Sequence, residues 1–126
     1  MRHRRDGGYA ATLCVMTKVL IVGGGYIGLE AASVAAKLGL QVTLVEMADR
    51  ILQRVASPET SSFFRDLHRA HGVDIREGVG LSQLTGDRVV TGAALSDGSM
   101  LEVDFVIAGV GVAPATQLAE TAGIDI

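Results

Sequence analysis

The chain has 126 residues, the length of one domain, and 48% of them are hydrophobic, which is enough to build a core. The 16 glycines against 2 prolines indicate tight turns and close backbone approaches, and they exclude a collagen-like chain. A net charge of −3 argues against nucleic acid as the main partner, and no apolar run approaches the roughly 18 residues of a membrane span. The single cysteine, Cys14, excludes an internal disulfide and fits a cytoplasmic protein.

Residues 1–16 are expected to form an N-terminal tail, and residues 17–126 to form the folded domain. The tail carries a basic cluster at residues 2–5, which is interpreted as a solvated segment and not as a binding patch.

The first elements in chain order predict a βαβ unit. Residues 18–22 are a short apolar run that ends at glycines, which favours a buried parallel strand. Residues 26–38 have helical periodicity, and Gly39 follows where a C-cap glycine belongs. The apolar positions that recur at helical spacing are Ile27, Ala31, Val34, Ala35 and Leu38. Residues 41–45 give a second strand, so the unit spans close to the ~30 residues typical of βαβ.

A second helix and a third strand are predicted next. Ser57 is expected to be the N-cap and Pro58 the first helical residue, and the helix is expected to end at His71. The side chains expected to point inward are Phe63, Phe64 and Leu67. Residues 73–75 then give a third parallel strand.

The later sequence predicts an antiparallel meander and one more buried strand. Short strands are expected over residues 79–85, 88–95 and 99–103, with turn signals that contain glycine between them. Residues 104–108 form a buried strand that ends at a second glycine cluster.

The first glycine cluster predicts a binding site for the pyrophosphate of a dinucleotide. Gly23, Gly25 and Gly28 match G-x-G-x-x-G, directly after a strand and at the start of a helix. Gly23 permits the tight turn, a side chain at Gly25 would block the pyrophosphate, and Gly28 lets the helix pack closely on the strand. Free N–H groups at the helix start would face the phosphates. This fingerprint alone leaves NAD and FAD open.

An acidic residue at the end of the second strand favours NADH over NADPH. Glu46 follows Gly28 by 18 residues, and its carboxylate can accept hydrogen bonds from the adenine ribose and repel a 2′-phosphate. Arg50 and Arg54 lie nearby, and two interpretations stay open for them, namely solvated surface or contact with the adenine or phosphate.

The second glycine cluster is expected to face the same crevice. Gly109, Val110 and Gly111 end the last predicted parallel strand. Ligands of open α/β sheets bind beyond the carboxyl ends of such strands.

Neither a metal site nor a catalytic residue is predicted. His68 and His71 are three residues apart on a helix, but no third ligand accompanies them, so a solvated helix face is expected. No Ser-His-Asp or Cys-His set points to nucleophilic catalysis.

These motifs together carry a resemblance. Residues 22–30, Glu46 and residues 109–114 resemble the NAD-binding domain of FAD-dependent pyridine nucleotide-disulfide oxidoreductases. Residues 54–59, followed by Phe63-Phe64 and His68, look like the ferredoxin, putidaredoxin and rubredoxin reductase branch. The resemblance covers about residues 17–126. It implies a Rossmann-like FAD/NAD(P)-binding α/β fold in three layers, β/β/α, with a parallel sheet and an antiparallel three-stranded meander.

The resemblance also implies a function. In that family NADH passes a hydride to FAD, and the flavin then passes electrons to an iron–sulfur protein such as a ferredoxin or rubredoxin. Tyr26 matches an aromatic near the nicotinamide pocket, and Glu30 matches a carboxylate near the carboxamide. The expected cofactor-binding set is Gly23, Gly24, Gly25, Tyr26, Ile27, Gly28, Glu30, Glu46, Arg54, Gly109, Val110 and Gly111.

One departure from the family and two alternatives remain. The chain has one dinucleotide fingerprint where the full enzymes have two, so it is expected to be a fragment that is inactive alone, with FAD bound mainly by an absent domain. The first alternative is an FAD-binding domain, although the Asp that usually follows the late glycine motif is absent after Gly111. The second is a non-catalytic NAD-sensing module.

Overall fold

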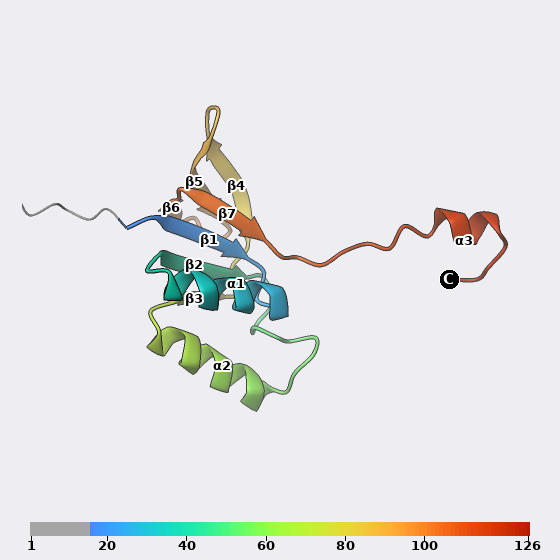
Figure 1. Ribbon diagram of the computed structural model, residues 1–126, viewed down its shortest axis with the longest axis horizontal. Helices are drawn as coiled ribbons and strands as arrows, with labels where there is room; N and C mark the ends of the chain where they lie inside the picture. Colours follow the sequence, from blue (N-terminus) through green and yellow to red (C-terminus); the bar gives the residue numbers. More distant parts are fainter. Residues whose placement is uncertain (1–15) are drawn as a thin grey trace, which may run out of the picture.

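The computed structural model describes residues 16–126; the predicted basic cluster and Cys14 lie outside this range. Figure 1 shows the elements, which are β1 (Lys18–Val22), α1 (Tyr26–Lys37), β2 (Gln41–Glu46), α2 (Pro58–Ala70), β3 (Asp74–Glu77), β4 (Leu81–Gly86), β5 (Val90–Leu95), β6 (Met100–Glu102), β7 (Phe105–Ala108) and α3 (Gln117–Thr121). The predicted strands and the first two helices are confirmed with nearly the same bounds, whereas α3 was not predicted. No helix within residues 16–126 is long and apolar enough to cross a bilayer.

Two sheets and two helices form three layers. The parallel sheet has the order β3-β2-β1-β7, and the antiparallel meander has the order β4-β5-β6. Helices α1 and α2 cover one face of the parallel sheet, and the meander packs on the other (Figure 1). The predicted three-layer α/β fold is confirmed.

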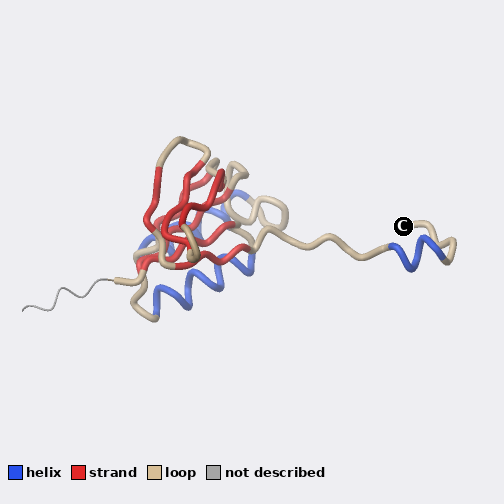
Figure 2. The backbone as a smooth tube through the Cα atoms, turned by 90° about the horizontal axis from the view of Figure 1, so that it is seen from above, coloured by secondary structure: helices blue, strands red, loops and turns tan. Residues whose placement is uncertain are grey.

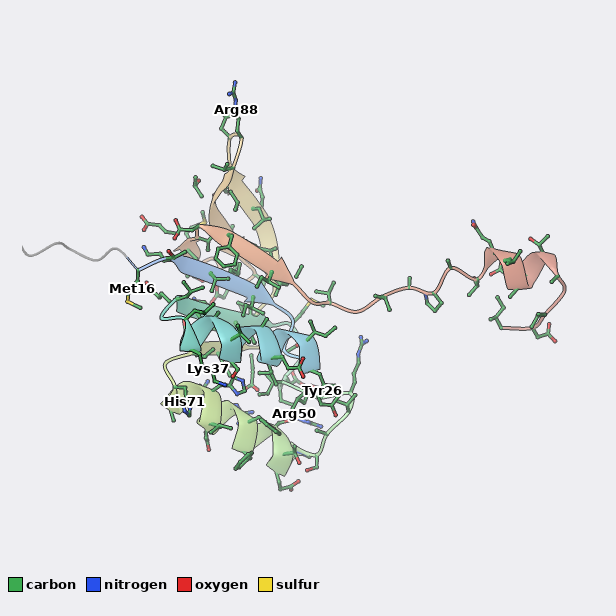
Figure 3. All side chains as sticks on the ribbon, in the orientation of Figure 1. Met16, Tyr26, Lys37, Arg50, His71 and Arg88 are labelled. Carbon is green, nitrogen blue, oxygen red and sulfur yellow. The ribbon has the colours of Figure 1, made fainter. Side chains whose placement is uncertain are left out.

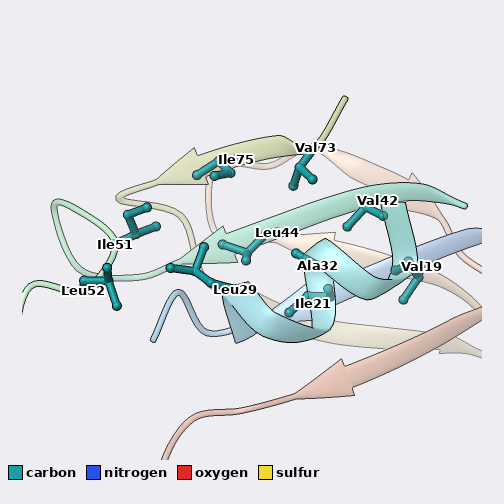
Figure 4. Packing of buried hydrophobic residues seen from close by; sticks show 11 residues of the cluster. Val19, Ile21, Leu29, Ala32, Val42, Leu44, Ile51, Leu52, Val73 and Ile75 are labelled. Atoms are coloured by element: carbon teal, nitrogen blue, oxygen red, sulfur yellow. The ribbon is translucent and has the colours of Figure 1, made fainter. Parts of the chain in front are cut away.

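The short apolar strands serve both outer layers because successive side chains point to opposite faces of a sheet. In β1, Val19 and Ile21 face the helices, whereas Leu20 packs with the meander. In β2, Leu44 faces the helices and Val45 faces the meander. All five side chains are almost fully buried. Figure 4 shows the helix-side cluster, in which Leu29 of α1 lies over the sheet and beside Ile51 and Leu52.

The buried face of α1 coincides only in part with the apolar positions at helical spacing. Of those apolar positions, Ile27, Val34 and Leu38 are exposed, Leu38 by 72%. The residues that are buried are Gly28, Leu29, Ala32 and Ala35. Because α1 is apolar around most of its circumference, periodicity cannot choose the inner face. The chosen face carries mainly small side chains, which let the helix approach the sheet closely.

The inner face of α2 is mainly polar, which also differs from the prediction. Phe63 and Leu67 are exposed, and only Phe64 of the three predicted residues packs against the core. The polar side chains that contact other elements from α2 are Ser61, Arg65 and His68. This helix therefore docks largely through hydrogen bonds, which hydrophobic periodicity does not register.

The ends of α2 are as predicted. The Ser57 hydroxyl accepts a hydrogen bond from the Thr60 N–H at 3.3 Å, and Pro58 is the first helical residue. After the C-cap residue His71, Gly72 turns the chain with a φ of +85°.

The last helix, α3, lies away from both sheets. Figures 1 and 2 show an extended segment that leads from β7 to α3, with no sheet or helix beside it. The packed layers run from β1 to β7, and the extent of the predicted domain, residues 17–126, stays a prediction.

Two leucines of the first helical segment test this packing. We expect Leu29→Ala to lower the free energy of unfolding by about 2–5 kcal/mol, because it leaves a cavity in the helix-side core. The control, Leu38→Ala, removes an exposed side chain and should change that free energy by about 0.5 kcal/mol or less. Urea unfolding measures both variants. Equal losses would show that the assignment of the helix faces is wrong.

Candidate functional site

Three loops meet at one edge of the parallel sheet. Val22 at the end of β1 pairs with Val45 of β2 and Ala108 of β7, so the carboxyl ends of these strands are aligned. The Gly23 N–H donates to the Val45 carbonyl at 2.9 Å, and the Gly109 N–H donates to the Val22 carbonyl at 2.8 Å. The two glycine clusters therefore lie side by side, as the sequence predicts.

Close backbone contact requires glycine at two positions. A Cβ on Gly23, which has a φ of +109°, would collide with the carbonyl oxygen of Gly109. A Cβ on Gly28 would collide with the carbonyl oxygen of Gly23, and it would lie 3.5 Å from the Ile21 side chain. Gly28 does bring the helix close to the strand, but the tightest contact is with the loop itself.

Gly25 differs from these glycines because the fold does not require it. Its φ of −83° and ψ of −169° are open to any residue, and a Cβ there would meet nothing within 4 Å. Gly25 is also the N-cap of α1, which has no side-chain cap. Free helix N–H groups and an open space in front of them suit a phosphate group. The site therefore fits the predicted pyrophosphate.

The carboxylate of Glu46 binds the backbone on both sides of the site. Its Oε2 accepts a hydrogen bond from the Gly24 N–H at 2.6 Å, and its Oε1 accepts one from the Ala48 N–H at 2.8 Å. These bonds hold the carboxylate against the glycine loop, a role that the sequence analysis did not anticipate. Each oxygen retains a further lone pair, so a ribose hydroxyl can still donate to it.

The segment of residues 47–57, here called the ribose loop, packs against Gly24. The Leu52 N–H donates to the Gly24 carbonyl at 2.9 Å. A Cβ on Gly24 would lie 2.7 Å from the Ile51 Cγ2 atom, so a larger residue would displace Ile51. Both polar backbone groups of Gly24 are thus bonded, one to the last residue of β2 and one to the ribose loop.

Arg50 stabilises the ribose loop from within. Its Nη1 donates to the Ala56 carbonyl at 2.8 Å and to the Ser61 Oγ at 2.6 Å. The Ser61 Oγ in turn donates to the Ile51 carbonyl at 2.6 Å. These internal contacts were not anticipated, and contact of Arg50 with the adenine or phosphate stays a prediction. Arg54 is exposed, and a role for it in binding stays a prediction.

A charged pair behind the ribose loop was missed by the sequence analysis. Arg65 of α2 donates to both carboxylate oxygens of Glu77, with Nε–Oε2 at 2.7 Å and Nη2–Oε1 at 2.9 Å. Glu77 also accepts the Ile51 N–H at 2.8 Å. One signal could have pointed to Glu77, because this residue ends the third strand beside Glu46.

Opposing effects act on the pKa of Glu77, and their balance lowers it. Burial raises it, but the hydrogen bonds from Arg65 and the Ile51 N–H and the charges of Arg65 and Arg69 outweigh burial, so the net shift is downward. The ionised form is therefore favoured in the folded state. The contribution of Glu77 to the free energy of unfolding is therefore fully present above about pH 4.3, which is the pKa of an unperturbed glutamate, and it is lost as the pH falls below that value.

Four other predicted ligand residues are exposed, so a ligand could reach them. Tyr26 and Ile27, at the start of α1, are 62% and 69% exposed. Glu30, one turn further on, and Val110, after β7, are also exposed. In the view of Figure 3, Tyr26 and Arg50 both lie beside the helices α1 and α2. Their roles toward a ligand stay predictions.

The two histidines differ in their surroundings. The ring nitrogens of His68 lie 2.8 Å from the Phe64 carbonyl oxygen and 3.1 Å from that of Leu29. The expected solvated position is therefore wrong for His68, which lies between α2 and α1, and is confirmed for the exposed His71. In the described part of the chain, no group of three or more His, Cys, Asp or Glu side chains could hold a metal.

Gly28 provides a test of the close backbone contact. Helix propensity alone would make Gly28→Ala stabilising by about 1 kcal/mol. The clash with the Gly23 carbonyl should instead make it destabilising, by about 1–3 kcal/mol. The control, Gly25→Ala, should stay within about 0.5 kcal/mol of the wild type because its Cβ enters open space. Thermal and urea unfolding distinguish these outcomes, and a gain in stability for Gly28→Ala would contradict the geometry.

Known proteins share this sequence and this fold. The sequence profile of the pyridine nucleotide-disulphide oxidoreductase family matches residues 3–126. The 5,5'-dehydrodivanillate O-demethylase ferredoxin reductase subunit of Sphingobium sp. is 53% identical over 108 residues, or 84% of this chain and 26% of the relative. A ferredoxin–NAD(P)(+) reductase of Sphingomonas sp. is 48% identical over 125 residues, or 98% of this chain and 30% of the relative.

A solved structure agrees with these relatives. The reductase in a covalent putidaredoxin reductase–putidaredoxin complex superposes with a TM-score of 0.84 at 42% identity, over 87% of this chain and 27% of that one. The chain therefore spans between a quarter and a third of the length of the proteins that it matches.

Proposed function

The chain belongs to the pyridine nucleotide-disulphide oxidoreductase family, and we propose that it is the NADH-binding domain of a flavin-dependent reductase. In this proposal the whole enzyme takes hydride from NADH onto FAD and passes electrons to an iron–sulfur protein of the ferredoxin or rubredoxin type. The observation that carries the proposal is the open space at Gly25, because the fold has no need of glycine there and a pyrophosphate does. The relatives are named as ferredoxin reductases, and this supports an iron–sulfur protein as the electron acceptor.

Each part of NADH has a counterpart among the described residues. The N–H groups at the start of α1 would hold the pyrophosphate beside Gly25, and the Glu46 carboxylate would accept the hydroxyls of the adenine ribose. Tyr26 and Glu30 would lie along the nicotinamide half. The protein contributes binding and orientation in this arrangement, and the cofactors supply the redox chemistry.

The charges around the ribose support NADH over NADPH. The Glu46 carboxylate lies on the glycine loop, where it would repel a 2′-phosphate. The nearest arginine in sequence, Arg50, already donates to the Ala56 carbonyl and Ser61, so it is committed within the protein. Met47 and Ala48 carry no charge.

A side chain at Gly25 tests the pyrophosphate site. We expect Gly25→Val to abolish NADH binding, because its methyl groups would occupy the space of the phosphates, while the free energy of unfolding stays nearly unchanged. Titration of wild type and variant with NADH, NADPH and FAD, followed by fluorescence or calorimetry, measures the effect. Normal NADH affinity in the variant would show that the pyrophosphate does not bind at this loop. Tight FAD binding by the wild type without NADH binding would favour an FAD-binding domain instead.

The charge of Glu46 tests the nucleotide preference. Glu46→Ala should loosen the loop for both nucleotides but remove the repulsion only for NADPH. The ratio of NADH affinity to NADPH affinity should therefore fall, by about tenfold if one charged hydrogen bond is lost. Asp49→Ala is the matched control, since Asp49 is an exposed carboxylate three residues further on, and it should leave the ratio unchanged. A ratio that does not move in Glu46→Ala would exclude Glu46 from the ribose.

A further inference from the structure

The ribose loop is attached to the rest of the protein by an ion pair that touches no predicted ligand position. We infer that Glu77 and Arg65 are positioning residues, which hold the ribose loop and, through it, Gly24 in the geometry that receives the dinucleotide. This inference rests on the proposed function and adds residues outside the predicted binding set. The contacts that carry it begin at β3 and α2 and end at the glycine loop.

The first step is from the ion pair to Ile51. Arg65 binds Glu77 through two parallel hydrogen bonds, a geometry that fixes the direction of the carboxylate. The carboxylate then accepts the Ile51 N–H at 2.8 Å. On its other side, the Ile51 carbonyl accepts the buried Ser61 hydroxyl at 2.6 Å. Both backbone groups of Ile51 are therefore held by side chains from β3 and α2.

The second step is from Ile51 to the glycine loop. The Ile51 side chain is fully buried and lies directly against Gly24. The next residue, Leu52, donates its N–H to the Gly24 carbonyl at 2.9 Å. Figure 4 shows Ile51 and Leu52 beside Leu29, at the start of α1. A shift of Ile51 would thus move Gly24, whose N–H donates to the Glu46 carboxylate.

The backbone of Leu52 indicates that this geometry needs external support. Leu52 has a φ of +56°, and it is the one non-glycine residue with a positive φ within the described residues. Such a conformation is disfavoured for a branched side chain and persists where surrounding contacts impose it. Glu77 and Ser61 hold the preceding residue, Ile51, and the Gly24 carbonyl accepts the N–H of Leu52 itself.

The burial of the pair separates it from the other ion pairs. The side chains of Arg65 and Glu77 are 19% and 15% exposed, whereas Asp74, which pairs with Arg76 on the same strand, is 51% exposed. Exposed pairs contribute little to structure because water screens them. Asp74 is therefore a suitable control for the loss of a carboxylate from β3.

The experiment uses the 126-residue chain and the variants Glu77→Ala and Glu77→Gln. The readouts are the NADH dissociation constant and the amide hydrogen exchange of Gly24, Ile51 and Leu52. We expect Glu77→Ala to weaken NADH binding about tenfold, the size of one lost charge-assisted hydrogen bond, and to speed exchange at these three amides. Glu77→Gln keeps an oxygen that can accept the Ile51 N–H, so it should recover part of both effects.

Two controls separate positioning from a general loss of stability. Asp74→Ala should leave NADH affinity and the three amides unchanged. Val73→Ala truncates a core side chain directly before β3. It should lower the free energy of unfolding without a comparable loss of NADH affinity. If Glu77→Ala weakens binding no more than Val73→Ala and the three amides stay protected, the inference is wrong. If the wild type itself fails to bind NADH, the proposed function fails first, and the positioning role fails with it.

Discussion

Direct contact between backbone segments at the carboxyl ends of β1 and β7 governs the architecture of the site. Gly28 lies against the carbonyl of Gly23, and Gly23 lies against the carbonyl of Gly109, so there is no room for a side chain at either contact. These contacts fix where α1 begins over the sheet and bring the two glycine clusters together. The open position at Gly25 is meaningful because its neighbours are so closely packed.

The second half of the site depends on polar contacts in addition to core packing. Glu46 and the ribose loop hold the two backbone groups of Gly24, and the loop is held in turn by Arg50 and Glu77. Charge-assisted hydrogen bonds are directional, so they fix the backbone of a loop whose Ile51 and Leu52 side chains lie in the core. The helix that supplies part of this network, α2, faces inward with a serine, an arginine and a histidine.

The sequence was sufficient for the order of elements and for the glycine loop, because both depend on local signals. Runs such as residues 18–22 and the turn glycines specify strands and their ends almost unaided. The inner faces of α1 and α2 agree with the sequence only in part, for instance at Ala35 and Phe64, because hydrophobicity could not indicate that small residues would pack in one helix and polar residues in the other. The partners of Arg50 and Glu77 lie up to 26 residues away in sequence and could be found only from the fold.

The polar docking of α2 has a consequence for how the molecule opens. Ser61 is the only fully buried residue of that helix, and Phe64 is the one apolar side chain that the helix packs on the core, so its detachment should precede the separation of the sheets. Such a detachment would also release the carbonyl of Ile51 and one side of Glu77. A ligand that binds only the closed form makes opening rarer. Protease sensitivity near α2 would therefore report whether the distant glycine loop is occupied.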